Sequence, residues 1–265
     1  MLDESSGLEV NNRNNIWSLS DSGGKPELYN FDSAGLLQRI VGITNAANID
    51  WEEMAQDKVG NFYVGDFGNN NNNRKELVIY KIPNPSSFTG SSVTATKINF
   101  TYPDQYAFPP ADSLKNFDME SMIALNHHLY LFSKNRTRPY NGFTKLYRLP
   151  DVAGTYTAEL LDSFYIPWET EYYANITSAD ISPDGSRVVL LNAQTIRVFS
   201  NYKGDNFFRG NMQQFTFEKM TQKEAVCFIS NDELYITDEY NDAPIGGQKL
   251  YYVDMRPFLP STKKK

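Results

Sequence analysis

The sequence predicts an all-β protein built from repeated units, and three observations support this prediction. Short runs rich in Val, Ile, Tyr and Phe recur along the chain, separated by Gly, Asn, Asp and Pro. These runs return in the same order several times, so the chain repeats itself. No segment sustains the apolar periodicity of a helix. Successive antiparallel units of four strands are typical of a β-propeller, in which each unit forms one blade.

The innermost strand of each unit is expected at a short run that opens near a carboxylate. Five such runs occur: SSGLEV from Ser5, DWEEMA from Asp50, DMESMIAL from Asp118, SADIS from Ser178 and KEAVCFI from Lys223. The second strand follows after a tight turn. Its runs are IWSLSD from Ile16, FYVGD from Phe62, LYLFSK from Leu129, VVLLN from Val188 and LYITD from Leu234.

The third and fourth strands complete each predicted unit. The third runs are LYNFD from Leu28, LVIYKI from Leu77, LYRL from Leu146, IRVF from Ile196 and LYYVD from Leu250. A fourth, more amphipathic run follows in four units: LLQRIVGI, TKINFTY, AELLDSFYI and QQFTFEK. The spacing is regular, because Glu52–Asp66, Glu120–Lys134 and Glu224–Asp238 are each separated by 14 residues.

These units predict one propeller domain over residues 1–265 with five blades, at about 4–44, 48–102, 117–166, 176–219 and 222–260. Six blades is the alternative if a degenerate unit lies in 103–116 or 167–176. The fifth unit has only Asp254–Lys265 for an outer strand, broken by Pro257 and Pro260. The sequence therefore leaves open whether an N-terminal strand ahead of Glu4 takes part in closing the ring.

Composition limits the classes of partner. The 265 residues are 40% hydrophobic, enough to bury a large core. The formal charge of -7 argues against a nucleic-acid partner, which requires a basic face. The single cysteine, Cys227, excludes an internal disulfide and is expected as a small buried apolar residue. Neither a run of 18 apolar residues nor an apolar N-terminal segment occurs, so we expect no membrane span and no signal peptide within this chain.

Long polar connections are predicted to crowd one face of the propeller. In antiparallel blades the first strand begins, the second ends and the third begins on the same face. The long connections were all expected there, at 68–75, 103–116, 134–143, 167–176 and 239–247, whereas the first-to-second hairpins are tight. Long loops on a rigid scaffold are common binding sites. The five consecutive asparagines from Asn69 must form a turn, and Asn69 and Asn70 are candidate ligand contacts.

Acidic residues are expected to converge at the center of this face. Asp50, Glu52, Asp118, Glu120 and Glu224 hold equivalent places at the starts of innermost strands, and Asp21, Asp66 and Asp238 end neighboring strands. Crowded carboxylates become protonated, pair with Arg or Lys, or hold a cation through hard oxygen ligands. Three interpretations remain open: the acids cap backbone amides and connect the blades, they bind a Ca²⁺-like cation, or two of them form a catalytic pair.

Two specific sites are excluded by spacing and position. The GDFGNN segment is not an EF-hand loop, because position three from Asp66 is Gly68 and position twelve is Leu77 instead of glutamate. His127 and His128 are the two histidines of the sequence, and both fall in a hairpin on the opposite face. A Ser-His-Asp triad or a His-ligated zinc among the acids is therefore not expected.

Aromatic residues in the long connections suggest a binding surface. Tyr and Trp on exposed loops stack on sugars or anchor a peptide, although they also fold back over the blades. Both interpretations stay open for Tyr102, Tyr106, Phe108, Tyr140, Trp168, Tyr172 and Tyr173. Of these, Tyr106, Tyr140 and Trp168 are the candidate contacts for a glycan or protein ligand.

Several motifs carry a family resemblance along nearly the whole chain. They are ESSGL at Glu4, SLSDSGG at Ser18, DWEEMA at Asp50, GDFGNN at Gly65, FDMESM at Phe117, LYLFSKN at Leu129 and SADISPDG at Ser178. With these the chain resembles a family of secreted β-propeller proteins of Bacteroidetes-type bacteria. The resemblance implies a propeller in a secreted, cell-surface or periplasmic location, and it implies no catalytic residues because that family has no assigned activity.

A more distant likeness rests on the acids alone. In their expected place the acids are similar to those of gluconolactonase and strictosidine-synthase-like propellers, whose central channel holds a divalent cation. Two functions follow as hypotheses. The first is a binding module for a glycan, protein or small molecule; the alternative is a cation-dependent hydrolase of lactonase type. We favor binding, since no histidine or cysteine is expected beside the acids to assist catalysis.

Overall fold

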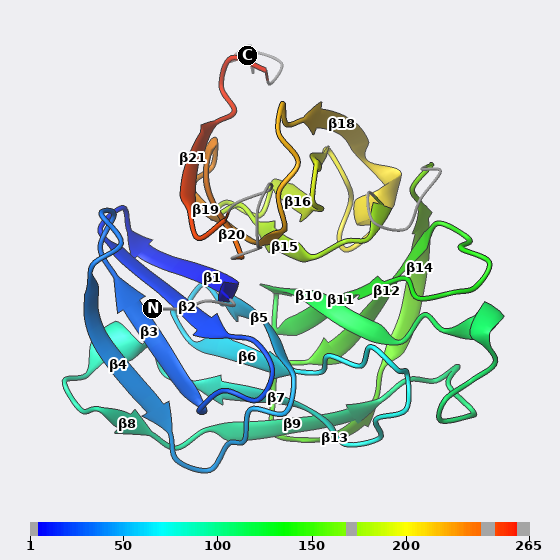
Figure 1. Cartoon of the computed structure of the whole chain (residues 1–265), viewed down its shortest axis with the longest axis horizontal. Coiled ribbons are helices and arrows are strands. Elements are labelled where there is room, and N and C mark those ends of the chain that lie inside the picture. The colour runs from blue at the N-terminus through cyan, green and yellow to red at the C-terminus, as the bar shows by residue number, and fades with distance from the viewer. Residues whose placement is uncertain (1–4, 168–173, 240–246, 259–265) are drawn as a thin grey trace.

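The computed structural model of the chain describes residues 5–167, 174–239 and 247–258, and it confirms an all-β propeller of five blades (Figure 1). Blade 1 contains β1 (Ser5–Asn12), β2 (Asn15–Ser20), β3 (Glu27–Phe31) and β4 (Leu37–Ile43). Blade 2 contains β5 (Trp51–Gln56), β6 (Phe62–Asp66), β7 (Leu77–Ile82) and β9 (Thr96–Thr101). Blade 3 contains β10 (Asp118–Leu125), β11 (His128–Lys134), β12 (Phe143–Pro150) and β14 (Glu159–Tyr165).

The last two blades follow the same order. Blade 4 contains β15 (Ser178–Ile181), β16 (Arg187–Leu191), β17 (Thr195–Ser200) and β18 (Asn211–Thr216), and blade 5 contains β19 (Lys223–Ser230), β20 (Glu233–Asp238) and β21 (Leu250–Asp254). The predicted runs FYVGD, LVIYKI and LYYVD coincide with β6, β7 and β21 residue for residue. Apolar side chains of β6 and β7 pack against the blades on both sides, which explains why apolar runs located these strands.

The four-stranded antiparallel pattern holds only in part. The short strand β8 (Ser92–Val93) joins blade 1 in parallel with β4, and β13 (Gly154–Thr157) joins blade 2 in parallel with β9. Each comes from the connection between the third and fourth strands of the following blade. Blade 5 has three strands in the described chain. No sixth blade forms there either: residues 103–116 contain only the short helix η2 (Asp112–Leu114).

The expectation that every long connection lies on one face is wrong. The segment from Pro83 to Ala95 joins the third and fourth strands of blade 2 at the opposite end of the blade, and it carries the short helix η1 (Pro85–Ser87) and β8. A second such connection lies between β17 and β18 and contains η3 (Phe207–Arg209). We call the end at which the innermost strands begin the mouth face.

Five apolar clusters, one at each junction between neighboring blades, form the core and close the ring. The innermost strands pack in the order β1, β5, β10, β15, β19 and back to β1. The cluster between blades 5 and 1 is the smallest and contains Leu8, Val10, Ile16, Ala225, Cys227 and Tyr235. Cys227 is buried there as predicted. Packing of β1 against β19 therefore closes the described propeller without a strand exchanged between the termini.

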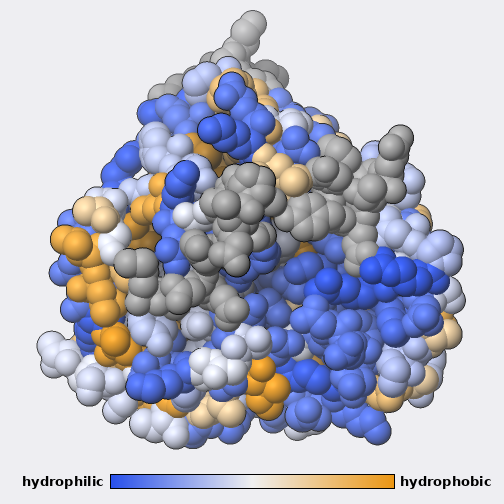
Figure 2. Space-filling view, viewed as in Figure 1, coloured by the Kyte–Doolittle hydropathy of each residue, from blue (hydrophilic) through white to orange (hydrophobic). Residues whose placement is uncertain are grey.

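The outer surface is mostly polar on the side seen in Figure 2, and apolar residues gather along the edge formed by β4. Leu36, Leu37 and Ile40 are exposed in this region. Within the described residues, no helix combines the length and the apolar character needed to cross a membrane.

Candidate functional site

Three glutamates occupy the same place in their blades. Glu52, Glu120 and Glu224 are each skipped in the pairing with the second strand, at a β-bulge of β5, β10 and β19. Gly7 is skipped in the same way in β1. A bulge redirects a side chain out of the normal alternation, so all three glutamates are buried near the ring of innermost strands. The prediction that they lie on the strands nearest the propeller axis is confirmed.

The structure brings Glu52 together with two aspartates on the mouth face. One carboxylate oxygen from each of Asp21, Asp50 and Glu52 lies within 4.8 Å of the others. Asn48 connects the two segments that carry the aspartates: its amide nitrogen donates to the Ser20 and Asp21 carbonyls, each at 2.9 Å, and its side-chain oxygen accepts from the Trp51 backbone nitrogen at 3.2 Å. Two oxygens bound to one Ca²⁺ at about 2.4 Å are at most about 4.8 Å apart, so the group has the spacing of a shared cation. We call Asp21, Asp50 and Glu52 the carboxylate triad.

Gly68 allows the triad to form. A methyl group added at Gly68 would lie 2.2 Å from Glu52 Oε1 and 2.6 Å from Asp50 Oδ2. Any other residue would displace at least one of these carboxylates. The glycine after Phe67 in GDFGNN therefore has a packing role against the acids, beyond the turn expected from the sequence.

Among the residues that the structure describes, Glu52 has no hydrogen-bond or ion-pair partner that explains its burial. Its relative exposure is 4%, and no hydrogen bond or ion pair to a described residue involves its carboxylate. Burial, together with the nearby Glu120, Asp21 and Asp118, raises its pKa well above the ordinary value, although Lys134 opposes the shift. For Asp50, burial and the Asp21 carboxylate raise the pKa to about 6. Both groups would be stabilized in the charged form by a cation placed between them.

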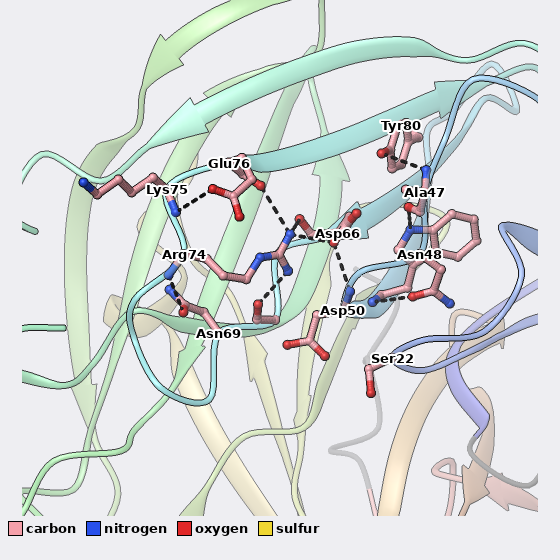
Figure 3. A network of polar contacts seen from close by, with 12 residues as sticks. Ser22, Ala47, Asn48, Asp50, Asp66, Asn69, Arg74, Lys75, Glu76 and Tyr80 are labelled. Atoms are coloured by element: carbon pink, nitrogen blue, oxygen red, sulfur yellow. Dashed lines mark hydrogen bonds and ion pairs between the residues drawn. The ribbon is translucent and has the colours of Figure 1, made fainter. Parts of the chain in front are cut away.

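The other acids of this face have protein partners. Asp66 accepts from the Asp50 backbone nitrogen at 3.1 Å and pairs with Arg74 at 2.8 Å, as Figure 3 shows. Asp238 accepts from the Lys249 backbone nitrogen and the Tyr251 hydroxyl. Asp66 thereby connects Asp50 to Arg74, and Asp238 holds the residues at the start of β21.

Blade 3 supplies two basic residues to the same face. Lys134 Nζ lies 3.0 Å from Glu120, and Arg136 Nε lies 2.7 Å from Asp118. Burial lowers the pKa of Lys134, but Glu120 and Glu224 outweigh this effect and raise it overall. Asp118 and Glu120, both predicted as metal ligands, pair with these two basic residues in the described structure, and their role as ligands stays a prediction.

Glu224 and Asn175 line a cavity of about 280 Å³ between blades 3, 4 and 5. Burial raises the pKa of Glu224, although Lys134 opposes the shift. Asn175 is only 7% exposed, and its side-chain oxygen has no hydrogen-bond partner among the described residues. A buried amide of this kind favors a ligand that donates a hydrogen bond. The cavity is lined by Lys134, Arg136, Asn175, Thr177, Ala193, Gln222 and Glu224.

The asparagine loop, which contains the five asparagines Asn69–Asn73, connects blade 2 to blade 3. Asn72, at a positive φ of 54°, accepts from the Phe117 backbone nitrogen at 2.8 Å through its side chain. The Asn69 backbone nitrogen donates to Asp118 at 2.6 Å, and the Asn69 side-chain oxygen accepts from Arg74. Asn69 is buried in this network, whereas Asn70 is exposed and contacts Arg136. Of the two predicted ligand contacts in the loop, the structure exposes only Asn70.

Asn72→Ala is expected to lower the free energy of unfolding by about 2 kcal/mol, because the buried Phe117 N–H would lose its acceptor. Chemical denaturation at neutral pH would measure the change. Asn71→Ala is the matched control, since Asn71 is an exposed residue of the same loop. Equal stabilities for the two variants would show that the loop does not hold the blades together.

The predicted aromatic contacts do not form one described surface. Tyr106 is 89% exposed, in the connection between β9 and β10. Tyr140 packs against the apolar cluster of blades 3 and 4, and Tyr102 is buried between Phe100 and Phe117. Trp168, Tyr172 and Tyr173 lie outside the described residues. Tyr106 is thus the exposed member of the predicted set in the described chain.

A second group of acids, absent from the sequence prediction, lies on the innermost strands β1, β5 and β15. It contains Glu9, Glu53 and Asp180. Ser178 donates to Glu53, and the Phe228 backbone nitrogen donates to Asp180 at 2.6 Å. Burial raises the pKa of Glu9 and Glu53 and brings that of Asp180 to about 7. These carboxyl groups hydrogen-bond across blades and have a structural role.

The structure resembles two solved propellers. It aligns with the PQQ-bound aldose sugar dehydrogenase of Streptomyces coelicolor over 96% of this chain and 95% of that chain, with a TM-score of 0.54 and 10% identity. It aligns with a gluconolactonase of Xanthomonas campestris over 95% of this chain and 72% of that chain, with a TM-score of 0.49 and 13% identity. At such identities the likeness shows the fold alone. No family model and no curated sequence matches the chain.

Proposed function

We propose that this protein is an extracytoplasmic binding propeller that holds a divalent cation, with Ca²⁺ as the best candidate, at the carboxylate triad of its mouth face. The observation that carries the proposal is that the carboxylates of Asp21, Asp50 and Glu52 lie together. Of these, Glu52 is buried without a hydrogen-bond donor among the described residues. Ca²⁺ takes six to eight oxygen ligands. Three carboxylates would leave coordination positions open to a ligand.

The ligand class that fits this surface is a hydroxyl-bearing molecule such as a glycan. Hydroxyl oxygens are suitable ligands for the open positions of a cation. The neighboring cavity offers the unpaired Asn175 oxygen as an acceptor and the ammonium and guanidinium groups of Lys134 and Arg136 as donors. Tyr106 is exposed to stack on a sugar ring from the rim. The location outside the cytoplasm follows from the family resemblance and is part of the proposal.

Binding of monosaccharides is expected to depend on calcium. Isothermal titration of a panel of hexoses, uronic acids and aldonic acids would be carried out with calcium and with a chelator. We expect binding of at least one class only with calcium, and its loss in Glu52→Gln. Glu53→Gln is the matched control, because Glu53 is the adjacent acid and hydrogen-bonds to Ser178 instead. Binding that persists in chelator would contradict a cation-dependent site.

The second candidate is a cation-dependent hydrolase of lactonase type, and the raised pKa of Asp50 favors it. In the ion-free protein the pKa of Asp50 is about 6, so this carboxylate exchanges a proton near neutral pH, and an adjacent cation would lower the pKa and keep Asp50 ionized as a base. In the described structure no histidine lies near the triad, since both histidines belong to the β10–β11 hairpin. Following the pH of a lactone solution after adding protein, with Asp50→Asn as the control, would separate hydrolysis from binding.

A further inference from the structure

Blade 5 differs from the others at its outer edge. In blades 1 to 4 the third strand pairs with a fourth, but in the described chain β21 pairs only with β20. The side chains of β21 are correspondingly half-buried or exposed, whereas those of the third strand β17 in blade 4 are nearly all buried. An unpaired strand edge offers backbone donors and acceptors to another strand.

The described residues that follow β21 turn away from this edge. The Met255 backbone nitrogen donates to the Asp232 carbonyl at 2.9 Å, and Phe258 packs against Phe215 of blade 4 with ring centroids 5.7 Å apart. The described residues that follow β21 therefore cross toward β18 instead of returning along β21.

A groove lies beside the open edge. It has a volume of about 900 Å³ and runs between the end of blade 4 and the face of blade 5. Phe217, Tyr251 and Val253 line it, and all three are half-buried members of the apolar cluster shared by these blades. A fourth strand on β21 would bring its inward side chains near these residues, because side chains alternate between the two faces of a strand.

The groove is basic although the protein is acidic. Its charged lining consists of Glu218, Lys219, Lys223 and Lys249, while the whole chain carries -7. Lys223 is buried and donates to the Ala193 and Lys219 carbonyls. Lys219 and Lys249 are exposed and remain accessible to a ligand. Charge complementarity therefore favors an acidic occupant.

We propose that blade 5 binds an extended acidic segment of a partner protein, which pairs with β21 as a fourth strand and places alternate apolar side chains in the groove. This is β-strand addition, in which backbone pairing supplies affinity and side-chain pockets supply specificity. The C-terminal Lys263, Lys264 and Lys265 of this chain have the wrong charge for the site. A second copy would present the same lysine-bearing edge, which disfavors self-pairing.

The probe is a fluorescent seven-residue peptide of alternating valine and glutamate, the length of β4 and β14. We expect it to raise the anisotropy signal on binding to the full chain, and to slow amide hydrogen exchange within Leu250–Asp254. Lys219→Glu combined with Lys249→Glu should weaken binding by about tenfold or more at low salt. Lys203→Glu, an exposed lysine outside the groove, is the matched control.

Control peptides and a truncated chain identify the other occupants. One control peptide has lysine in place of glutamate, and a second has all its valines followed by all its glutamates. Both should bind at least tenfold more weakly than the alternating peptide. The proposal is overturned if all peptides bind alike or none binds. It is also overturned if only a variant ending at Phe258 binds, since the chain's own end would then fill the groove. Sedimentation would show whether the chain dimerizes. A dimer that is lost in the Lys219→Glu/Lys249→Glu variant would assign the edge to a second copy instead.

Discussion

Calcium is expected to raise the free energy of unfolding by about 2.7 kcal/mol when its free concentration is 100 times the dissociation constant. The physical reason is that an ion between Asp21, Asp50 and Glu52 binds the folded protein only, and it relieves the repulsion of carboxylates within 4.8 Å of one another. Thermal unfolding in calcium and in chelator measures the difference. The same experiment with magnesium tests selectivity, because Mg²⁺ requires a tighter octahedral site.

Two variants separate the triad from the wider ring of acids. Glu52→Gln should abolish the calcium response at nearly constant side-chain volume. Glu120→Gln should retain it, because Glu120 is paired with Lys134 at 3.0 Å. Loss of the response in both variants would extend the ligand set to blade 3. An identical melting temperature with calcium and chelator in the parent protein would remove both the cation and the lactonase hypothesis.

The pH dependence of stability has opposite signs with and without the ion. In chelator the folded Asp50 has a pKa of about 6, above its ordinary value of 3.8. The folded state then binds more protons than the unfolded state between these values, so the Asp50 contribution to stability grows as the pH falls from about 7 toward 4. Calcium binds the ionized Asp50 carboxylate, so the stabilization of the folded protein by calcium decreases as the pH falls through about 6.

Gly7→Ala is expected to destabilize the propeller by about 4 kcal/mol, the sum of a strained backbone and a steric clash. Gly7 has a φ of +60°, and an added methyl group would lie 2.7 Å from the Met54 backbone nitrogen of the neighboring blade. The backbone of β5 has no space to move, because β1 and β10 pack on either side of it. Urea denaturation measures the loss.

Gly204→Ala is the matched control for this prediction. Its φ of +61° imposes the same backbone strain, but an added methyl group would meet no atom within 4 Å. We expect a loss of about 1 kcal/mol, so the difference between the variants reports the contact between blades. Equal losses would mean that β1 moves away from β5 without cost, and that the ring of innermost strands is loosely packed.

Strand placement was predictable because each strand depends on local pattern. FYVGD and LVIYKI alternate or concentrate apolar residues over five or six positions, and the Gly, Asn and Asp residues around them mark turns. The 14-residue spacing of Glu52 and Asp66 likewise belongs to a hairpin in which the glutamate is bulged, and a bulged glutamate recurs in blades 3 and 5. The added strands β8 and β13 were missed because both are short and pair with another blade.

The sequence by itself determined the propeller, its five repeats and the place of the glutamates on the innermost strands, since hairpins and alternation act over a few residues. Only the tertiary structure decided which acids meet. Asp21 lies beside Asp50 and Glu52 because Asn48 hydrogen-bonds across two blades. The Glu120 carboxylate instead forms an ion pair with Lys134. Such pairings depend on distances of a few ångströms between side chains that are not neighbors in sequence, and electrostatic energies change over those same distances.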